Sequence, residues 1–145
     1  HDVFAHSYEY ASSLSYLGHR DGLKGDLSAL DNLSFAAALG ATGATNRAAV
    51  GEALMAVGVG EVAELPLRQL SAGQRRRVAI CRSLLGDATL WILDEPFSNL
   101  DSPGRRWGHE QVSAHLDRGG AAVITSHHAL ALPGHAPREL SLGGG

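Results

Sequence analysis

The chain has 145 residues, of which 44% are hydrophobic and 19% are charged, so it has the size and composition of one globular domain. Its net charge of −3 and isoelectric point near 6.2 argue against nucleic acid as an obligate partner. The single cysteine, Cys81, suits a reducing compartment. No apolar run approaches the ~20 residues of a membrane-spanning helix, and no signal peptide opens the chain. Because residue 1 is His rather than Met, we expect a fragment whose N-terminus has been removed.

The first half of the chain predicts one short strand followed by two helices. Residues 12–17 are loosely apolar and can form a strand, after which a turn-rich loop follows. Ser28 and Asp31 have the spacing of a capping box, which predicts a helix that ends at Gly40. Residues 46–57 carry apolar side chains at helical spacing and predict a second amphipathic helix.

The second half predicts part of a parallel α/β core. Ser71 and Gln74 form another capping box at the start of a helix. The apolar run at 90–93 is too short for a helix and too continuous for a half-exposed strand, so we expect a buried central strand. Three further elements are expected: a rather polar helix at about 105–116, a buried strand at 121–125 and a short strand at 139–142. Two parallel strands cannot make a sheet with both faces buried, which predicts further strands upstream.

An acidic pair, Asp94 and Glu95, follows the strand expected at 90–93. Asp94 ends an apolar strand, where its carboxylate is well placed to hold Mg²⁺ through the water shell of the ion. Glu95 comes one residue later, where the side-chain direction reverses, so it can act as general base toward a water that attacks a γ-phosphate. The alternative for the pair alone is that both carboxylates only end a strand in solvent.

The stretch Leu70-Ser71-Ala72-Gly73-Gln74 opens the helix that precedes this strand. A helix N-terminus attracts phosphate, Ser71 can donate its hydroxyl, and Gly73 lets the backbone approach closely. The arginines at 75–77 then place three positive charges at the unfavourable end of the helix dipole. We expect them to face polyphosphate or an acidic partner; the alternative is that they are solvated and that Ser71 is only a cap.

His127 follows the strand expected at 121–125 after one serine. A histidine at the carboxyl edge of a strand can hydrogen-bond a γ-phosphate and report whether it is present. Without the upstream motifs, His127 would be one of eight scattered histidines. No group of His and Cys residues has the spacing of a zinc site.

Together these motifs resemble those of ABC-type ATPases. Leu70 to Gln74 resembles the signature motif, residues 90–95 the Walker B strand, Ser98-Asn99-Leu100-Asp101 the D-loop, and His127 the switch histidine. The resemblance implies an α/β fold, a partial P-loop NTPase core with parallel strands plus a helical signature subdomain. It implies a single domain over 1–145, with the Q-loop and helical subdomain at about 20–75 and the rest of the core at about 76–145. The phosphate-binding G-x-x-x-x-G-K-[ST] loop is absent from the 145 residues, so we expect this fragment alone to be inactive.

A narrower resemblance is to the ATP-binding subunit of the cytochrome c maturation system, also called the haem exporter. Its features here are Trp91 within Walker B, Ala72 in the signature, and His19 at the Q-loop position, where most ABC ATPases carry glutamine. The resemblance implies that a homodimer hydrolyses ATP to ADP and phosphate with Mg²⁺, each signature motif serving the ATP of the other subunit. It also implies membrane permease partners, no nucleic acid, and a peripheral place on the cytoplasmic face of the bacterial inner membrane.

Three alternatives stay open. The chain can belong to another ABC importer or exporter that differs only in its membrane partner. It can belong to a soluble ABC-type protein acting on ribosomes or DNA, although the short helices between His19 and Leu70 argue against the long coiled coil of such proteins. It can also be a non-hydrolysing remnant, which Glu95 and His127 argue against.

Overall fold

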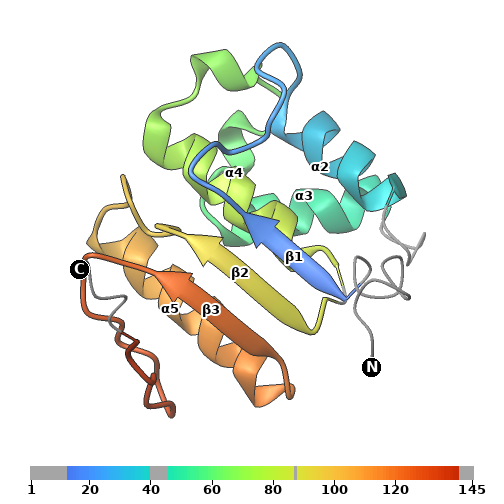
Figure 1. The fold of residues 1–145 in the computed structure, drawn as a ribbon. Coiled ribbons are helices and arrows are strands. Elements are labelled where there is room, and N and C mark those ends of the chain that lie inside the picture. The colour runs from blue at the N-terminus through green and yellow to red at the C-terminus, as the bar shows by residue number, and fades with distance from the viewer. Residues whose placement is uncertain (1–12, 40–45, 87, 141–145) are drawn as a thin grey trace.

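The computed structural model describes residues 13–39, 46–86 and 88–140. Three parallel strands lie side by side in the order β1 (Leu14–Leu17), β2 (Leu90–Asp94) and β3 (Ala121–Thr125) (Figure 1). Leu17 lies opposite Leu93, and Asp94 lies opposite Thr125. β1 corresponds to the strand expected at 12–17 and pairs with β2 on the side away from β3. The expectation of further strands upstream stays a prediction. Because all three strands are parallel, their carboxyl ends meet at one edge of the sheet.

The described part of the chain also forms four α-helices and two 3₁₀ turns. They are α2 (Ala29–Leu39), α3 (Arg47–Ala56), η1 (Gly60–Val62), η2 (Leu67–Gln69), α4 (Ala72–Leu84) and α5 (Ser102–Asp117). The expected caps are present: the Ser28 hydroxyl accepts from the Asp31 N–H at 3.0 Å, and Ser71 and Gln74 form the reciprocal capping box. At α3, the Asn46 side chain accepts from the Ala49 N–H at 2.8 Å.

Helix α4 stands between two hydrophobic cores. Val78 and Cys81 belong to a core built with α2 and α3, whereas Ala79 and Ile80 belong to a core under the sheet. Apolar residues on several faces of one helix indicate a helix enclosed on both sides. In Figure 1, α4 accordingly lies between α2 and α3 and the strand β1.

The two faces of the sheet differ in cover. Helix α5 lies behind β2 and β3 (Figure 1), and on this side the Trp91 indole stacks on the His115 imidazole with ring centroids 3.9 Å apart. On the opposite face no described helix covers the strands, and Tyr16 and Val123 are 60% and 57% exposed. No described helix is both long enough and apolar enough to cross a membrane.

Three expectations about the C-terminal half are corrected. The strand at 121–125 was expected to be buried, but it lies at the edge of the described sheet and every second residue of β3 is exposed. Helix α5 begins at Ser102 rather than near residue 105, because the Asp101 carboxylate caps it by accepting from the Gly104 N–H at 2.9 Å. Residues 139 and 140 are not in a strand, and the rest of the expected strand, like Gly40, lies outside the described residues.

Candidate functional site

Asp94, Glu95 and Thr125 form one hydrogen-bonded cluster at the carboxyl edge of the sheet. The Thr125 hydroxyl donates to Asp94 Oδ1 at 2.6 Å and accepts from the Glu95 N–H at 3.0 Å. The Thr125 carbonyl also accepts from the Glu95 N–H, at 3.1 Å. One side chain from β3 thus fixes the two consecutive carboxylate residues at the end of β2.

His127 lies beside this cluster, as its position after β3 predicts. Its Nε2 is 3.4 Å from Glu95 Oε1, and its side chain is 91% exposed whereas that of Glu95 is 23% exposed. The structure therefore brings Asp94, Glu95 and His127 together at one edge, with His127 on the outer side.

The backbone of Glu95 has a left-handed conformation, with φ of +45°. Residues with a Cβ seldom adopt this region, so the surrounding contacts must hold it. The N–H of Glu95 donates to the Thr125 hydroxyl. The carbonyl of Glu95 accepts from Ser98 Oγ at 2.8 Å and from Arg76 Nη2 at 2.8 Å. The direction of the Glu95 side chain therefore depends on three other segments of the chain.

The donor set at Asp94 fits a hard divalent cation. Its carboxylate is half-buried, and its second oxygen has no hydrogen bond among the described residues. No three His, Cys, Asp or Glu side chains in the described ranges are grouped to hold a metal ion. Magnesium is commonly held by one or two carboxylates together with waters and substrate phosphates, and Asp94 matches that kind of site.

The signature residues sit at the N-terminus of α4 and bond to one another. The Ser71 Oγ accepts from the Gln74 N–H at 3.1 Å, and Gln74 Oε1 accepts from the Ser71 N–H at 2.9 Å. Leu70 is buried and Ala72 is exposed. None of the hydrogen bonds among the described residues joins residues 70–74 to Asp94, Glu95 or His127, so the structure does not unite the signature with the acidic pair.

The D-loop residues lie against the signature helix. A Cβ placed on Gly73 would lie 2.9 Å from the Asn99 carbonyl oxygen, so the small residue permits this approach within the chain. Leu100 is buried, and Ser98 donates to Glu95 as described. Asp101 pairs with Arg77 at 2.6 Å. The hydrogen bond from the Gly104 N–H, and to a smaller extent Arg77, hold the pKa of the Asp101 carboxyl below its usual range.

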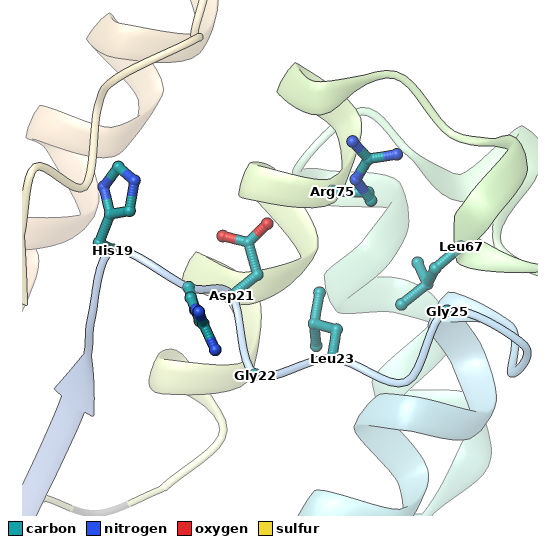
Figure 2. Close-up of a pocket in the computed structure, with 8 residues that line it drawn as sticks. His19, Asp21, Gly22, Leu23, Gly25, Leu67 and Arg75 are labelled. Atoms are coloured by element: carbon teal, nitrogen blue, oxygen red, sulfur yellow. The ribbon is translucent and has the colours of Figure 1, made fainter.

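His19 lines a cavity of about 710 Å³ beside α4. Figure 2 shows its lining residues, which come from the loop after β1 and from helix α4 and its approach: His19, Arg20, Asp21, Gly22, Leu23, Gly25, Leu67 and Arg75. His19 is exposed, whereas the Asp21 carboxylate points toward α4 and reaches Arg76 at 2.9 Å. The Q-loop position therefore lies at an open cavity rather than within the acidic cluster.

The three arginines of α4 each have an acceptor within the chain. Arg75 donates to the Leu70 carbonyl at 2.8 Å, and Arg77 pairs with Asp101. Arg76 is only 3% exposed and is bonded inside the protein. The alternative of solvated arginines is wrong for Arg76 and Arg77, because Arg76 pairs with Asp21 at 2.9 Å and Arg77 with Asp101 at 2.6 Å. The acidic groups that these two arginines face thus belong to the same chain, and a contact with polyphosphate stays a prediction.

Sequence reasoning missed Thr125 and Asp21. Thr125 is the last residue of a predicted strand, and the parallel register that puts it opposite Asp94 was a usable signal. Asp21 stands in a turn-rich loop, and nothing in its local pattern indicates the contact with Arg76, which is 55 residues away.

The fold is that of an ATP-binding cassette, with the acidic pair at the carboxyl edge of parallel strands. Residues 4–98 match the family model described as ABC transporter, and the chain belongs to that family. The solved post-hydrolysis dimer of the ATP-binding cassette MJ0796, bound to ADP and Pi, superposes with a TM-score of 0.75 at 23% identity. That match covers 88% of this chain and 58% of the solved one.

Two curated relatives carry the same name, cytochrome c biogenesis ATP-binding export protein CcmA. The protein of Methylococcus capsulatus is 44% identical over 141 residues, which are 97% of this chain and 67% of that protein. The protein of Pseudomonas aeruginosa is 50% identical over 124 residues, or 86% of this chain and 61% of that protein. The chain therefore resembles a subunit of the cytochrome c biogenesis type, and it spans 61 to 67% of the length of these two relatives.

Proposed function

We propose that this chain supplies part of the ATP-hydrolysing subunit of an ABC transporter complex for c-type cytochrome biogenesis. The observation that carries the proposal is the Asp94–Thr125–Glu95 cluster with His127 at 3.4 Å from Glu95. This cluster supports the proposal, because phosphoryl transfer to water needs a bound metal ion, an oriented water and a contact to the γ-phosphate, and Asp94, Glu95 and His127 could provide these at one sheet edge. The biological setting comes from the two relatives, which are named as cytochrome c biogenesis ATP-binding export proteins.

In this proposal each residue has one role. Asp94 would hold Mg²⁺, which would neutralise charge on the phosphates. Glu95 accepts the proton of a water whose oxygen bonds to the γ-phosphorus, while the bond from that phosphorus to the ADP oxygen breaks. His127, exposed above Glu95, hydrogen-bonds the γ-phosphate. The products are ADP and phosphate.

Residues 70–74 act in the other half of the site. They lie at a helix N-terminus, where N–H groups attract phosphate, and they are not joined to the acidic pair of their own chain. We assign them to the ATP of a second subunit in a homodimer, with the D-loop residues 98–101 between the two halves. The division into a helical part at about 20–75 and a core part at about 76–145 remains a prediction, and α4 continues across it.

The cavity at His19 is the place we assign to a membrane permease subunit. It is open, it lies beside α4, and it is lined by charged side chains of both signs. The complex would place this subunit on the cytoplasmic face of the bacterial inner membrane. Its work there would be haem export or the release of a haem–chaperone complex.

The catalytic role is tested by Glu95→Gln in the intact protein, which retains shape and removes the base. We expect kcat for ATP hydrolysis to fall by about 10²-fold or more with ATP binding retained. Glu110→Gln, an exposed carboxylate on α5, is the matched control and should leave kcat unchanged. Undiminished turnover in Glu95→Gln would refute the assignment.

The biological role is tested by complementation of a bacterial strain that lacks its own cytochrome c maturation ATPase. The intact wild-type protein should restore holocytochrome c and co-purify with membrane proteins of that system, and Glu95→Gln should co-purify without restoring haem attachment. Co-purification with an unrelated permease instead would favour another ABC importer or exporter.

A further inference from the structure

The buried Arg76 side chain uses every one of its N–H groups. Its Nε donates to the Pro96 carbonyl at 3.1 Å, and its Nη2 donates to the carbonyls of Asp94 at 2.7 Å and Glu95 at 2.8 Å. Its Nη1 donates to the Gly18 carbonyl at 3.1 Å and to Asp21 Oδ1 at 2.9 Å. A guanidinium has five N–H donors, so the set is complete.

These five bonds connect two loops that leave neighbouring strands. Gly18 and Asp21 follow β1, whereas Asp94 is the last residue of β2 and Glu95 and Pro96 begin the turn after it. Arg76 itself belongs to α4, five residues after the Ser71 cap. The side chain is thus the common point of the signature helix, the cavity-lining loop and the acidic turn.

The turn that Arg76 holds contains Glu95, whose backbone has the left-handed conformation. The Glu95 carbonyl accepts from Arg76 Nη2, and the carbonyls on either side of it accept from the same guanidinium. Three consecutive carbonyl oxygens directed at one rigid, planar group fix the orientation of the peptides between them. Thr125 holds the N–H side of Glu95, so rotation of this residue would break bonds at both ends.

We propose that Arg76 is a positioning residue, which sets the direction of the Glu95 carboxylate by clamping the carbonyls of residues 94–96 to α4. The inference rests on the proposed role of Glu95 as the base. Asp21, which lines the cavity, bonds to the same guanidinium, so the cavity and this turn share one contact. Neither the compositional pattern nor the motif spacing assigns this role to Arg76.

The test is steady-state ATP hydrolysis by the intact protein carrying Arg76→Gln or Arg76→Lys. Gln retains two amide donors and Lys three ammonium donors on one atom, so neither can reproduce the planar fork. We expect kcat to fall by roughly 10²-fold in Arg76→Gln, because misplacement of a reacting group by about 1 Å has that effect, with KM for ATP within about threefold of wild type. Arg76→Lys should fall between Arg76→Gln and the wild type.

Arg82→Gln is the matched control, because Arg82 lies on the same helix and donates to Gly22 in the same loop at 2.8 Å without reaching the acidic turn. It should leave kcat unchanged. Asp21→Asn keeps the four carbonyl bonds of Arg76, so its loss of kcat should be well below that of Arg76→Gln. Asp21→Asn also provides the test if Arg76→Gln does not fold, since a loss approaching 10²-fold there would overturn the carbonyl clamp.

The proposal is overturned if folded Arg76→Gln keeps wild-type kcat, or if Arg82→Gln loses as much as Arg76→Gln. Glu95→Gln, measured alongside, separates the two levels of the argument. If Glu95→Gln turns over normally, the proposed function fails; if it is inactive while Arg76→Gln is fully active, only the positioning role fails.

Discussion

Gly108 provides a stability prediction whose sign depends on one close approach. It lies in α5, and a Cβ added there would be 2.5 Å from Cε1 and 2.7 Å from Cδ1 of Phe97. The ring cannot retreat freely, because Phe97 is only 6% exposed and its other neighbour is the His109 imidazole, edge-on at 4.7 Å between centroids. Ala at this position must therefore displace either the ring or the helix.

The magnitude follows from two opposing effects. Replacing Gly by Ala in a helix interior stabilises by about 1 kcal/mol, whereas overpacking a filled core destabilises by about 1–3 kcal/mol. Gly51 in α3 isolates the first effect, because a Cβ there meets nothing within 4 Å. We expect Gly51→Ala to raise the free energy of unfolding by about 1 kcal/mol and Gly108→Ala to lower it by about 1 kcal/mol. Each kcal/mol corresponds to about 2–4 °C in Tm.

Urea denaturation followed by circular dichroism measures both variants against the wild type. The double variant Gly108→Ala/Phe97→Leu completes a cycle, in which the smaller side chain should recover at least about 1 kcal/mol of the Gly108→Ala loss. If Gly108→Ala stabilises as much as Gly51→Ala, Phe97 does not pack on this turn of α5 and the reasoning is refuted.

Three further predictions follow from the same structure. Burial raises the pKa of the Cys81 thiol to about 12. The fraction of thiolate at pH 8 should therefore be roughly 10³-fold lower in the native chain than in the urea-unfolded chain, and the rate of reaction with a disulfide reagent should be lower by the same factor. Because this pKa is higher in the folded state, the free energy of unfolding should be constant below the unfolded-state pKa of about 8.5 and fall as the pH rises toward 12. The fall should be shallower in Cys81→Ala, and equal slopes in the two proteins would contradict this. Thr125→Val removes the hydroxyl that bonds Asp94 and Glu95, so kcat of the intact protein should fall by about 10–100-fold, while Thr125→Ser should retain activity. The 145-residue chain by itself lacks a phosphate-binding loop and should bind a fluorescent ATP analogue poorly; a micromolar Kd would contradict this.

Elements with strong local signals were predictable from the sequence. Helix α4 has a capping box and β2 is a continuous apolar run, so the start of α4 and both ends of β2 were expected within a residue or two of those observed. Helix α3 was likewise marked by its apolar period. These signals lie within a few residues of one another, so they need no knowledge of the rest of the chain.

Helix α5 was less predictable because its packing does not use large apolar residues. Buried glycines, Gly104 and Gly108, let it approach its neighbours, and a histidine stacks on Trp91 where an aliphatic side chain would be the usual signal. Its cap, Asp101, was assigned to the D-loop, although one carboxylate serves both the helix start and Arg77. The expected start of this helix, near residue 105, was therefore three residues too late.

The candidate site was predictable to the extent that it follows strand ends. Asp94, Glu95 and His127 each come at or after a predicted strand, and parallel pairing then brings them to one edge. The partners that hold them were not predictable, since Arg76 meets Asp94 across 18 residues and Asp21 across 55. Three consecutive arginines give no sequence signal for which of them is buried.

The position of α4 explains why one short motif is joined to so many parts of the molecule. Residues 71–74 lie at the N-terminus of α4. In the next helical turn, Arg76 bonds to the Glu95 carbonyl and Arg77 pairs with the D-loop residue Asp101. Further side chains of α4 belong to both hydrophobic cores. A well-packed helix moves as a unit, because its neighbours on both sides leave no free volume for local adjustment. Any ligand that shifts the N-terminus of α4 must therefore move the Arg76 clamp with it, and the geometry of Glu95 becomes a function of what residues 71–74 bind.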